Sequence, residues 1–232
     1  DMLAKFVSIC EWRIAALITG GYYCEEIAQL IRGALKKCID HAPGLLKREE
    51  AAVQAVFEGL VIGGVAMNYA GLSRPASGVE HYISHVLDMR GVEFGTPVEL
   101  HGIQCAVGTR IAVALYEKLR NLTPDREKAL SYAAAFDYDD WSKALRDFLG
   151  KGAESMIALE RKEGKYDQGQ HALRLEKILK NWDALLEIMA QELPELQELD
   201  ALYDTVGLPK TLGEIGVEDS FLPMIFRCTK DI

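Results

Sequence analysis

The sequence predicts an all-α protein, on three observations. Apolar residues recur at helical spacing from Met2 to Ile18 and from Tyr22 to Cys38, with Gly20 and Gly21 separating the two stretches. Runs of β-branched residues in an alternating apolar and polar pattern, which would indicate strands, do not occur. A chain of 232 residues that is 49% hydrophobic is long enough to bury a sizeable core.

The next two segments also have helical signals. Arg48 to Tyr69 begins with acidic residues, where the helix dipole favours them, and then becomes almost wholly apolar. Glycines at positions 59, 63 and 64 cost about 1 kcal/mol each relative to alanine, so we expect another backbone to approach this helix closely. The segment is therefore predicted to be a buried central helix. Pro75 and Gly78 break the chain ahead of the following helix, Val79 to Met89.

The second half of the chain reads as further helices. Residues 90–99 form a connector to an apolar helix from Leu100 to Leu119, and Thr123-Pro124-Asp125 resembles the start of another helix. The segments 137–165 and 167–193 are richer in charge, with acid and base pairs typical of solvated helix faces. Residues 208–216 are expected to form a short capped turn before a last helix.

Composition excludes several classes of function. The net charge of −9 argues against a nucleic-acid footprint, and no uninterrupted apolar run reaches the roughly 18 residues that a membrane span needs. The 5 cysteines are widely spaced and form no CxxC pair, which is typical of small buried side chains in a reducing, cytoplasmic compartment. Gly20-Gly21 and Gly63-Gly64 do not lie between a strand and a helix, so we expect no NAD(P)-binding loop in this chain.

The histidines are the main candidates for a site. Of 5 histidines in the chain, three are His81, His85 and His101. His81 and His85 lie one helical turn apart on one face, and His101 opens the next apolar helix. Imidazole is a common zinc ligand, and a catalytic site needs only three protein ligands. A histidine pair on a helix is more often an ordinary surface or core feature, so the pattern alone leaves both interpretations open.

Two sequence blocks resemble a known family. Ser73-Arg-Pro-Ala-Ser-Gly-Val-Glu-His-Tyr-Ile-Ser-His85 and Leu100-His-Gly-Ile-Gln-Cys-Ala-Val-Gly-Thr109, together with Asp1-Met-Leu-Ala-Lys5, are similar to the C-terminal helical domain of sn-glycerol-1-phosphate dehydrogenases. Their superfamily also contains glycerol dehydrogenase, dehydroquinate synthase and the iron-dependent alcohol dehydrogenases. The resemblance implies that residues 1–232 are one helical metal- and substrate-binding domain, and that a Rossmann-like N-terminal nucleotide domain is absent from this chain.

The resemblance also implies a metal site. Its ligands would be Asp1, His81 and His101, while Asp1 and His85 would contact substrate. Iron-dependent alcohol dehydrogenases have a histidine where this chain has Lys5, so a three-ligand zinc-type site is expected, with nickel or iron as alternatives. The tail from Phe226 to Lys230 echoes the family only loosely.

Three other residues complete the expected site. Glu80 would orient a metal ligand from behind, although a solvated acid at a helix start is an equally good interpretation. Arg74, with Ser73 beside it, would meet the substrate phosphate in an otherwise acidic protein, or would only pack the loop. The catalytic role falls to His85, because an imidazole with an unperturbed pKa near neutrality can pass a proton to the new hydroxyl.

The implied activity is that of an oxidoreductase of phospholipid metabolism. It would transfer hydride reversibly between NAD or NADP and dihydroxyacetone phosphate, a small phosphorylated substrate, forming glycerol-1-phosphate. Such an enzyme can also be a homo-oligomer. The isolated chain should be inactive, because half of the cleft is missing. The alternatives are a glycerol dehydrogenase or dehydroquinate synthase relative, a stand-alone helical metal-binding or interaction module, and a fragment left by proteolysis.

Overall fold

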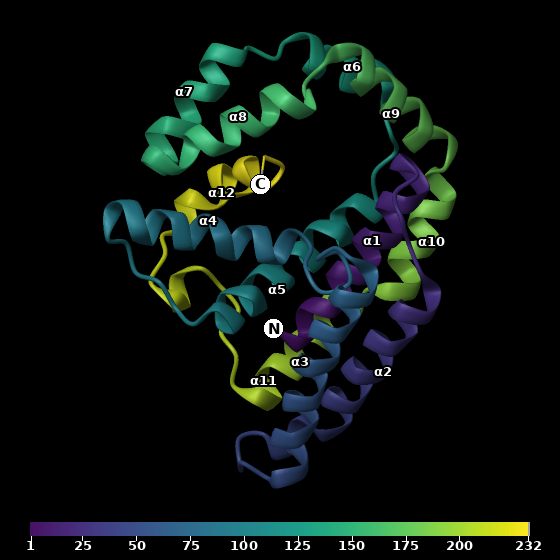
Figure 1. Cartoon of the computed structure of the whole chain (residues 1–232), viewed down its shortest axis with the longest axis vertical. Coiled ribbons are helices and arrows are strands. Elements are labelled where there is room, and N and C mark those ends of the chain that lie inside the picture. The colour runs from purple at the N-terminus through teal and green to yellow at the C-terminus, as the bar shows by residue number, and fades with distance from the viewer. Residues whose placement is uncertain (232) are drawn as a thin grey trace.

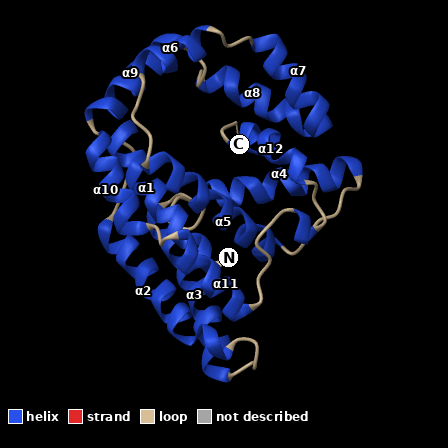
Figure 2. Cartoon of the chain, turned by 180° about the vertical axis from the view of Figure 1, so that it is seen from behind, coloured by secondary structure: helices blue, strands red, loops and turns tan. Residues whose placement is uncertain are grey.

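The computed structural model describes residues 1–231, and every regular element within that range is helical (Figures 1 and 2). The all-α prediction is confirmed. A short 3-10 turn, Met2–Ala4, precedes the first helix. The α-helices are α1 Lys5–Thr19, α2 Glu25–His41, α3 Glu50–Ala70, α4 Val79–Phe94, α5 His101–Arg120, α6 Arg126–Ala134, α7 Tyr138–Leu149, α8 Ala153–Glu163, α9 Gln168–Lys180, α10 Trp182–Glu192, α11 Leu196–Val206 and α12 Leu222–Thr229.

The crossing of α4 and α5 forms the centre of the molecule (Figure 1). Gly108 on α5 lets the two backbones touch, because a Cβ built there would lie 2.6 Å from the carbonyl oxygen of Glu80 on α4. Ile83 and Val107 are fully buried beside this contact, in a cluster that includes Trp141. The close crossing brings the first turns of α4 and α5, which carry the histidines, to one place.

The α2–α3 hairpin projects from this centre (Figure 1). The prediction that α3 is a buried central helix is wrong, because one of its faces is exposed: Val53, Phe57, Leu60, Val61, Val65 and Tyr69. Its glycines do not meet another backbone either. A Cβ at Gly59 would meet the side chains of Met2 and Cys38, while nothing lies within 4 Å of one at Gly64. Apolar composition predicted the helix but not its neighbours.

Helix α3 also bears on the membrane question. Among the described residues it is long and apolar enough to cross a membrane by length and composition, and 28% of its apolar window is buried. A single helix of this kind is a weak indication of a span, because core helices meet the same test.

Several predicted boundaries differ from the structure. Helix α4 continues past Met89 into the expected connector and ends at Gly95, which has a φ of 65°. Helix α6 is capped by Asp125, whose carboxylate accepts the N–H of Lys128, and not by Thr123. The two charge-rich segments are each divided, at Gly150 and at Asn181. Helix α11 was not predicted; Pro194 and Pro209 flank it, and prolines are typical of breaks between helices.

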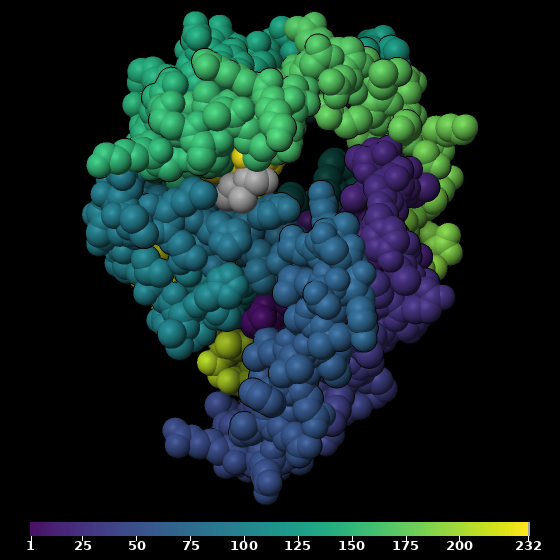
Figure 3. Space-filling model, in the orientation of Figure 1, coloured from purple at the N-terminus to yellow at the C-terminus, as the bar shows by residue number. Residues whose placement is uncertain are grey.

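Helices α6 to α9 form an arch over the centre, and Figure 3 shows an opening between this arch and the rest of the chain. One attachment of the arch is Trp141, which is fully buried in the cluster that contains Ile83 and Val107 and packs on the rings of Phe136, Tyr138 and Tyr166. Its indole N–H donates to Asp231 at 3.1 Å. At the other end of the arch, α9 packs on α1 and α10.

Candidate metal centre

Four side chains with metal-binding atoms converge where the 3-10 turn η1 (Met2–Ala4), α4 and α5 meet. They belong to Asp1, His81, His101 and Cys105, and one ligand atom from each lies within 4.8 Å of the others. Asp1 comes just before η1, His81 lies in the first turn of α4, and His101 is the first residue of α5. The structure therefore brings together the three predicted metal ligands and adds a cysteine.

Hydrogen bonds orient the His81 ring. Its Nδ1 lies 2.8 Å from Glu80 Oε1, and its Nε2 lies 3.2 Å from Asp1 Oδ1. Because Glu80 Oε1 also accepts the Gly78 N–H, we assign the proton to Nδ1, which leaves the Nε2 lone pair facing Asp1. Burial acts to lower the pKa of His81, but hydrogen bonds with Cys105 and Glu80 outweigh it, so the pKa is raised. A bound cation would have to displace a proton from Nε2 at acidic pH.

The His101 ring is held in a similar way. Its Nδ1 lies 3.0 Å from the hydroxyl of Ser84, on α4, and its Nε2 lies 3.4 Å from Cys105 Sγ. Burial lowers the pKa of His101, and the neighbouring His81 and His85 lower it further. A neutral imidazole is the form that binds a metal. Both rings therefore use Nδ1 for a protein partner and direct Nε2 to the shared centre.

Lys5 occupies the position one turn after Asp1. Its side chain is 3% exposed, and its ammonium donates to Asp1 Oδ1 at 3.1 Å and to the Ala76 carbonyl at 2.8 Å. Burial lowers the pKa of Lys5 to about 8. The ammonium thus ties Asp1 to the loop before α4. A protonated amine has no lone pair, so Lys5 does not act as a metal ligand in this form.

A second carboxylate lies behind the centre. Glu11 on α1 accepts hydrogen bonds from the Tyr116 hydroxyl and the Val79 N–H, both at 2.9 Å. Burial, followed by the negative charge of Glu80, raises the pKa of Glu11 to about 7. Among the described residues, Glu80 Oε2 has no hydrogen-bond partner, and a Cβ at Gly78 would lie within 3.0 Å of both carboxylates. The sequence analysis missed Glu11, although an acid inside the apolar pattern of α1 was a usable signal.

A cavity of about 280 Å³ opens onto the centre. The titratable side chains that line it are those of Asp1, Lys5, His81, His85 and His101. The rest of the wall includes Ala76, Ser77 and part of α3. His85 is exposed and stacks on His101 with ring centroids 6.0 Å apart, outside the group of converging ligand atoms. This cavity has room for a small substrate beside the metal-binding atoms.

The two predicted substrate contacts on the loop before α4, Ser73 and Arg74, are on the solvent-exposed side of that loop. Ser73 and Arg74 are exposed, and neither lines the cavity, whereas Ser77 on the same loop does. The Ser73 carbonyl accepts the N–H groups of Ala76 and Ser77, both at 2.9 Å, so it holds the turn. Contact of Ser73 or Arg74 with substrate stays a prediction.

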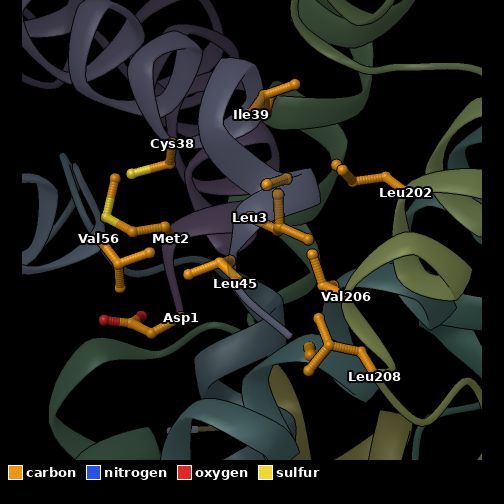
Figure 4. A pocket seen from close by; sticks show the side chains of 12 residues that line it. Asp1, Met2, Leu3, Cys38, Ile39, Leu45, Val56, Leu202, Val206 and Leu208 are labelled. Carbon is orange, nitrogen blue, oxygen red and sulfur yellow. The ribbon is translucent and has the colours of Figure 1, made fainter. Parts of the chain in front are cut away.

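A separate apolar cavity of about 220 Å³ adjoins Asp1 on another side. Figure 4 shows that the Asp1 carboxylate points away from Leu202, Val206 and Leu208, which line this cavity. Its remaining wall is mostly aliphatic. The polar chemistry at Asp1 therefore faces the histidine cavity.

Cys105 was not predicted as a candidate ligand. The cysteines were expected to be small buried side chains, and Cys105 is indeed fully buried. However, Cys105 follows His101 by four residues on α5, which puts both side chains on one face of the helix. That spacing was the available signal.

Comparison with known proteins supports the resemblance drawn from the sequence. No family model matches the chain. A protein of Bacillus velezensis named glycerol-1-phosphate dehydrogenase [NAD(P)+] is 38% identical over 139 residues, which are 57% of this chain and 35% of that protein. Proteins with the same name from Methanosarcina mazei and Hyperthermus butylicus are 36% and 39% identical over 116 residues, which are 50% of this chain and 32% of each protein. The resemblance is confirmed over about half of the chain, and the match spans about a third of these relatives' length.

Proposed function

We propose that the chain is the metal- and substrate-binding helical part of an NAD(P)-linked glycerol-1-phosphate dehydrogenase. The observation that carries this proposal is the convergence of Asp1, His81 and His101 in a chain whose relatives have that name. The reaction would be hydride transfer between a nicotinamide and the central carbon of dihydroxyacetone phosphate.

The three side chains fit a divalent cation. An Asp1 oxygen and a His81 nitrogen 3.2 Å apart match the separation of about 3.3 Å between neighbouring ligands of a tetrahedral zinc ion. Two imidazoles and a carboxylate suit zinc best, with nickel and iron as alternatives. When bound, such a cation polarises a carbonyl oxygen and stabilises the negative charge that develops on it.

The remaining residues of the cavity would handle substrate and proton. The exposed imidazole of His85 would hydrogen-bond the substrate oxygen and donate the proton that completes the alcohol. Asp1 would help to place the substrate at the cation. Arg74, on the outer side of the loop, would meet the phosphate together with Ser73. Glu80 would keep the His81 ring in its ligand orientation.

The nicotinamide would be held elsewhere. We propose that a nucleotide domain outside these 232 residues binds NAD or NADP, so that the chain alone lacks turnover. A reducing, cytoplasmic location belongs to the same proposal, because the 5 cysteines are free.

The substrate half of the proposal can be tested on the chain itself. Cobalt would replace zinc, and its visible spectrum would be followed while dihydroxyacetone phosphate or unphosphorylated dihydroxyacetone is added. We expect the phosphorylated ketone to change the spectrum at concentrations at least tenfold lower, and Arg74→Ala to remove this preference. An equal response to both ketones would contradict the assignment and favour a glycerol dehydrogenase relative.

The reaction itself needs the complete gene product that contains this chain. We expect it to oxidise NADH or NADPH when dihydroxyacetone phosphate is present and to lose most of this activity with His85→Ala. A complete protein that binds metal but shows no such turnover would refute the proposed reaction.

A further inference from the structure

The fourth member of the converging group is Cys105, and it has no part in the three-ligand site described above. Its side chain is fully buried on α5, and its sulfur lies 3.4 Å from His101 Nε2. This is the same nitrogen that faces the shared centre, because Ser84 takes Nδ1. The sulfur therefore borders the place that a cation would occupy.

The distances fit a fourth ligand. With bonds of about 2.3 Å to sulfur and about 2.0 Å to nitrogen, a tetrahedral zinc ion holds these two atoms about 3.5 Å apart. The observed Cys105 to His101 separation of 3.4 Å and the Asp1 to His81 separation of 3.2 Å both agree with one shared ion. Single ligand atoms of all four residues lie within 4.8 Å of one another.

Lys5 does not supply a fourth ligand from α1. The position one turn after Asp1 could supply a ligand from α1, but the Lys5 ammonium is bonded to Asp1 Oδ1 and the Ala76 carbonyl. It contributes a positive charge and no lone pair. Cys105 is the one further thiol, imidazole or carboxylate in the group of converging ligand atoms among the described residues.

We propose that Cys105 binds the cation as a fourth ligand, as a thiolate, giving an Asp1, His81, His101 and Cys105 centre. This inference rests on the metal site of the proposed function. Binding would form a metal–sulfur bond and release the thiol proton to solvent. The dipositive ion would then be neutralised by two anionic ligands, and a substrate oxygen would have to compete with the thiolate. Thiolate also favours zinc or cobalt over hard cations such as magnesium.

The test is the absorption spectrum of the chain titrated with cobalt. Thiolate ligation adds a charge-transfer band in the near ultraviolet, whereas nitrogen and oxygen ligands alone give only the visible bands. We expect the ultraviolet band in the wild type and its loss in Cys105→Ser, with at least tenfold weaker binding. Cys24→Ser is the matched control, because Cys24 lies outside the converging group, and it should keep the band.

The outcomes separate the two proposals. Visible bands without the ultraviolet band in the wild type would overturn the Cys105 assignment and leave the three-ligand site intact. A chain that binds no cobalt would overturn the metal site and the fourth ligand together. If Cys105→Ser fails to fold, X-ray absorption of the zinc-loaded wild type decides, with one sulfur at about 2.3 Å expected and a shell of only nitrogen and oxygen contradicting it.

Discussion

The α4–α5 crossing and the α2–α3 hairpin each contain an apolar helix with internal glycines, α5 and α3, yet the two helices differ in what surrounds them. At the crossing, Gly108 meets the Glu80 backbone, and the buried side chains of Glu80 and Ser84 hold His81 and His101. In the hairpin, Gly64 faces open space, and Phe57 is 68% exposed. The same sequence pattern therefore occurs in a closely packed region that positions the candidate site and in a helix with one solvent-exposed face.

This difference explains what sequence could predict. Helical periodicity is a local property, so the all-α class and most helices followed from it. The contact partner of a helix is not local, and α3 was wrongly predicted to be buried for that reason. The divisions at Gly150 and Asn181 were not predicted, because helical periodicity shows that a segment is helical but does not mark where one helix ends and the next begins.

The candidate site shows the same limit. His81, His85 and His101 stood out because histidine is scarce in this chain, whereas Asp1 was found only through family resemblance. Glu11 reaches the site from α1 through packing between helices, whereas Cys105 was signalled by its four-residue spacing from His101 on α5.

The substitution with the largest expected effect disrupts the contact between α4 and α5. Gly108→Ala would place a Cβ 2.6 Å from the Glu80 carbonyl oxygen, and we expect a loss of about 3 kcal/mol in the free energy of unfolding. Gly64→Ala is the matched control, with an expected gain of about 0.5–1 kcal/mol because nothing opposes the new methyl group. Urea unfolding measures both. Equal effects would contradict the difference between the two regions.

The next comparison concerns ligand orientation. Glu80→Gln keeps the size of the side chain but weakens the contact with His81 Nδ1, so we expect zinc to bind 10- to 100-fold more weakly, about 1.4–2.7 kcal/mol. Glu58→Gln on α3 should leave zinc affinity unchanged, because Glu58 pairs with Lys37 at the surface. Competitive titration against a zinc chelator gives both values. Unchanged affinity in Glu80→Gln would remove Glu80 from the site.

The pH dependence of the free energy of unfolding tests the buried carboxylates beside the crossing. The pKa of Glu11 is about 7 in the folded chain because of burial and the charge of Glu80, above the ordinary glutamate value of 4.5. Between these two values the folded state binds more protons than the unfolded state, so stability should fall as pH rises, by about 1–3 kcal/mol. Glu11→Gln should flatten this slope and be relatively more stable above pH of about 7. The exposed Glu50→Gln should not, and an identical slope in Glu11→Gln would contradict the assignment.

The smallest effect is expected on the hairpin face. Phe57→Ala should change the free energy of unfolding by no more than about 0.5 kcal/mol, since the ring is mostly exposed. Ile83→Ala at the crossing should cost at least about 2 kcal/mol, because Ile83 is fully buried. Thermal unfolding of the two variants compares them directly. A large loss with Phe57→Ala would mean that the α3 face is covered in solution.

The central claim is that Asp1, His81 and His101 share one cation, and zinc binding tests it most directly. Equilibrium dialysis should find one tightly bound zinc ion per wild-type chain and at least 100-fold weaker binding to His81→Ala, with unchanged helical content. Equal zinc retention by the two chains, or none by the wild type, would contradict the account.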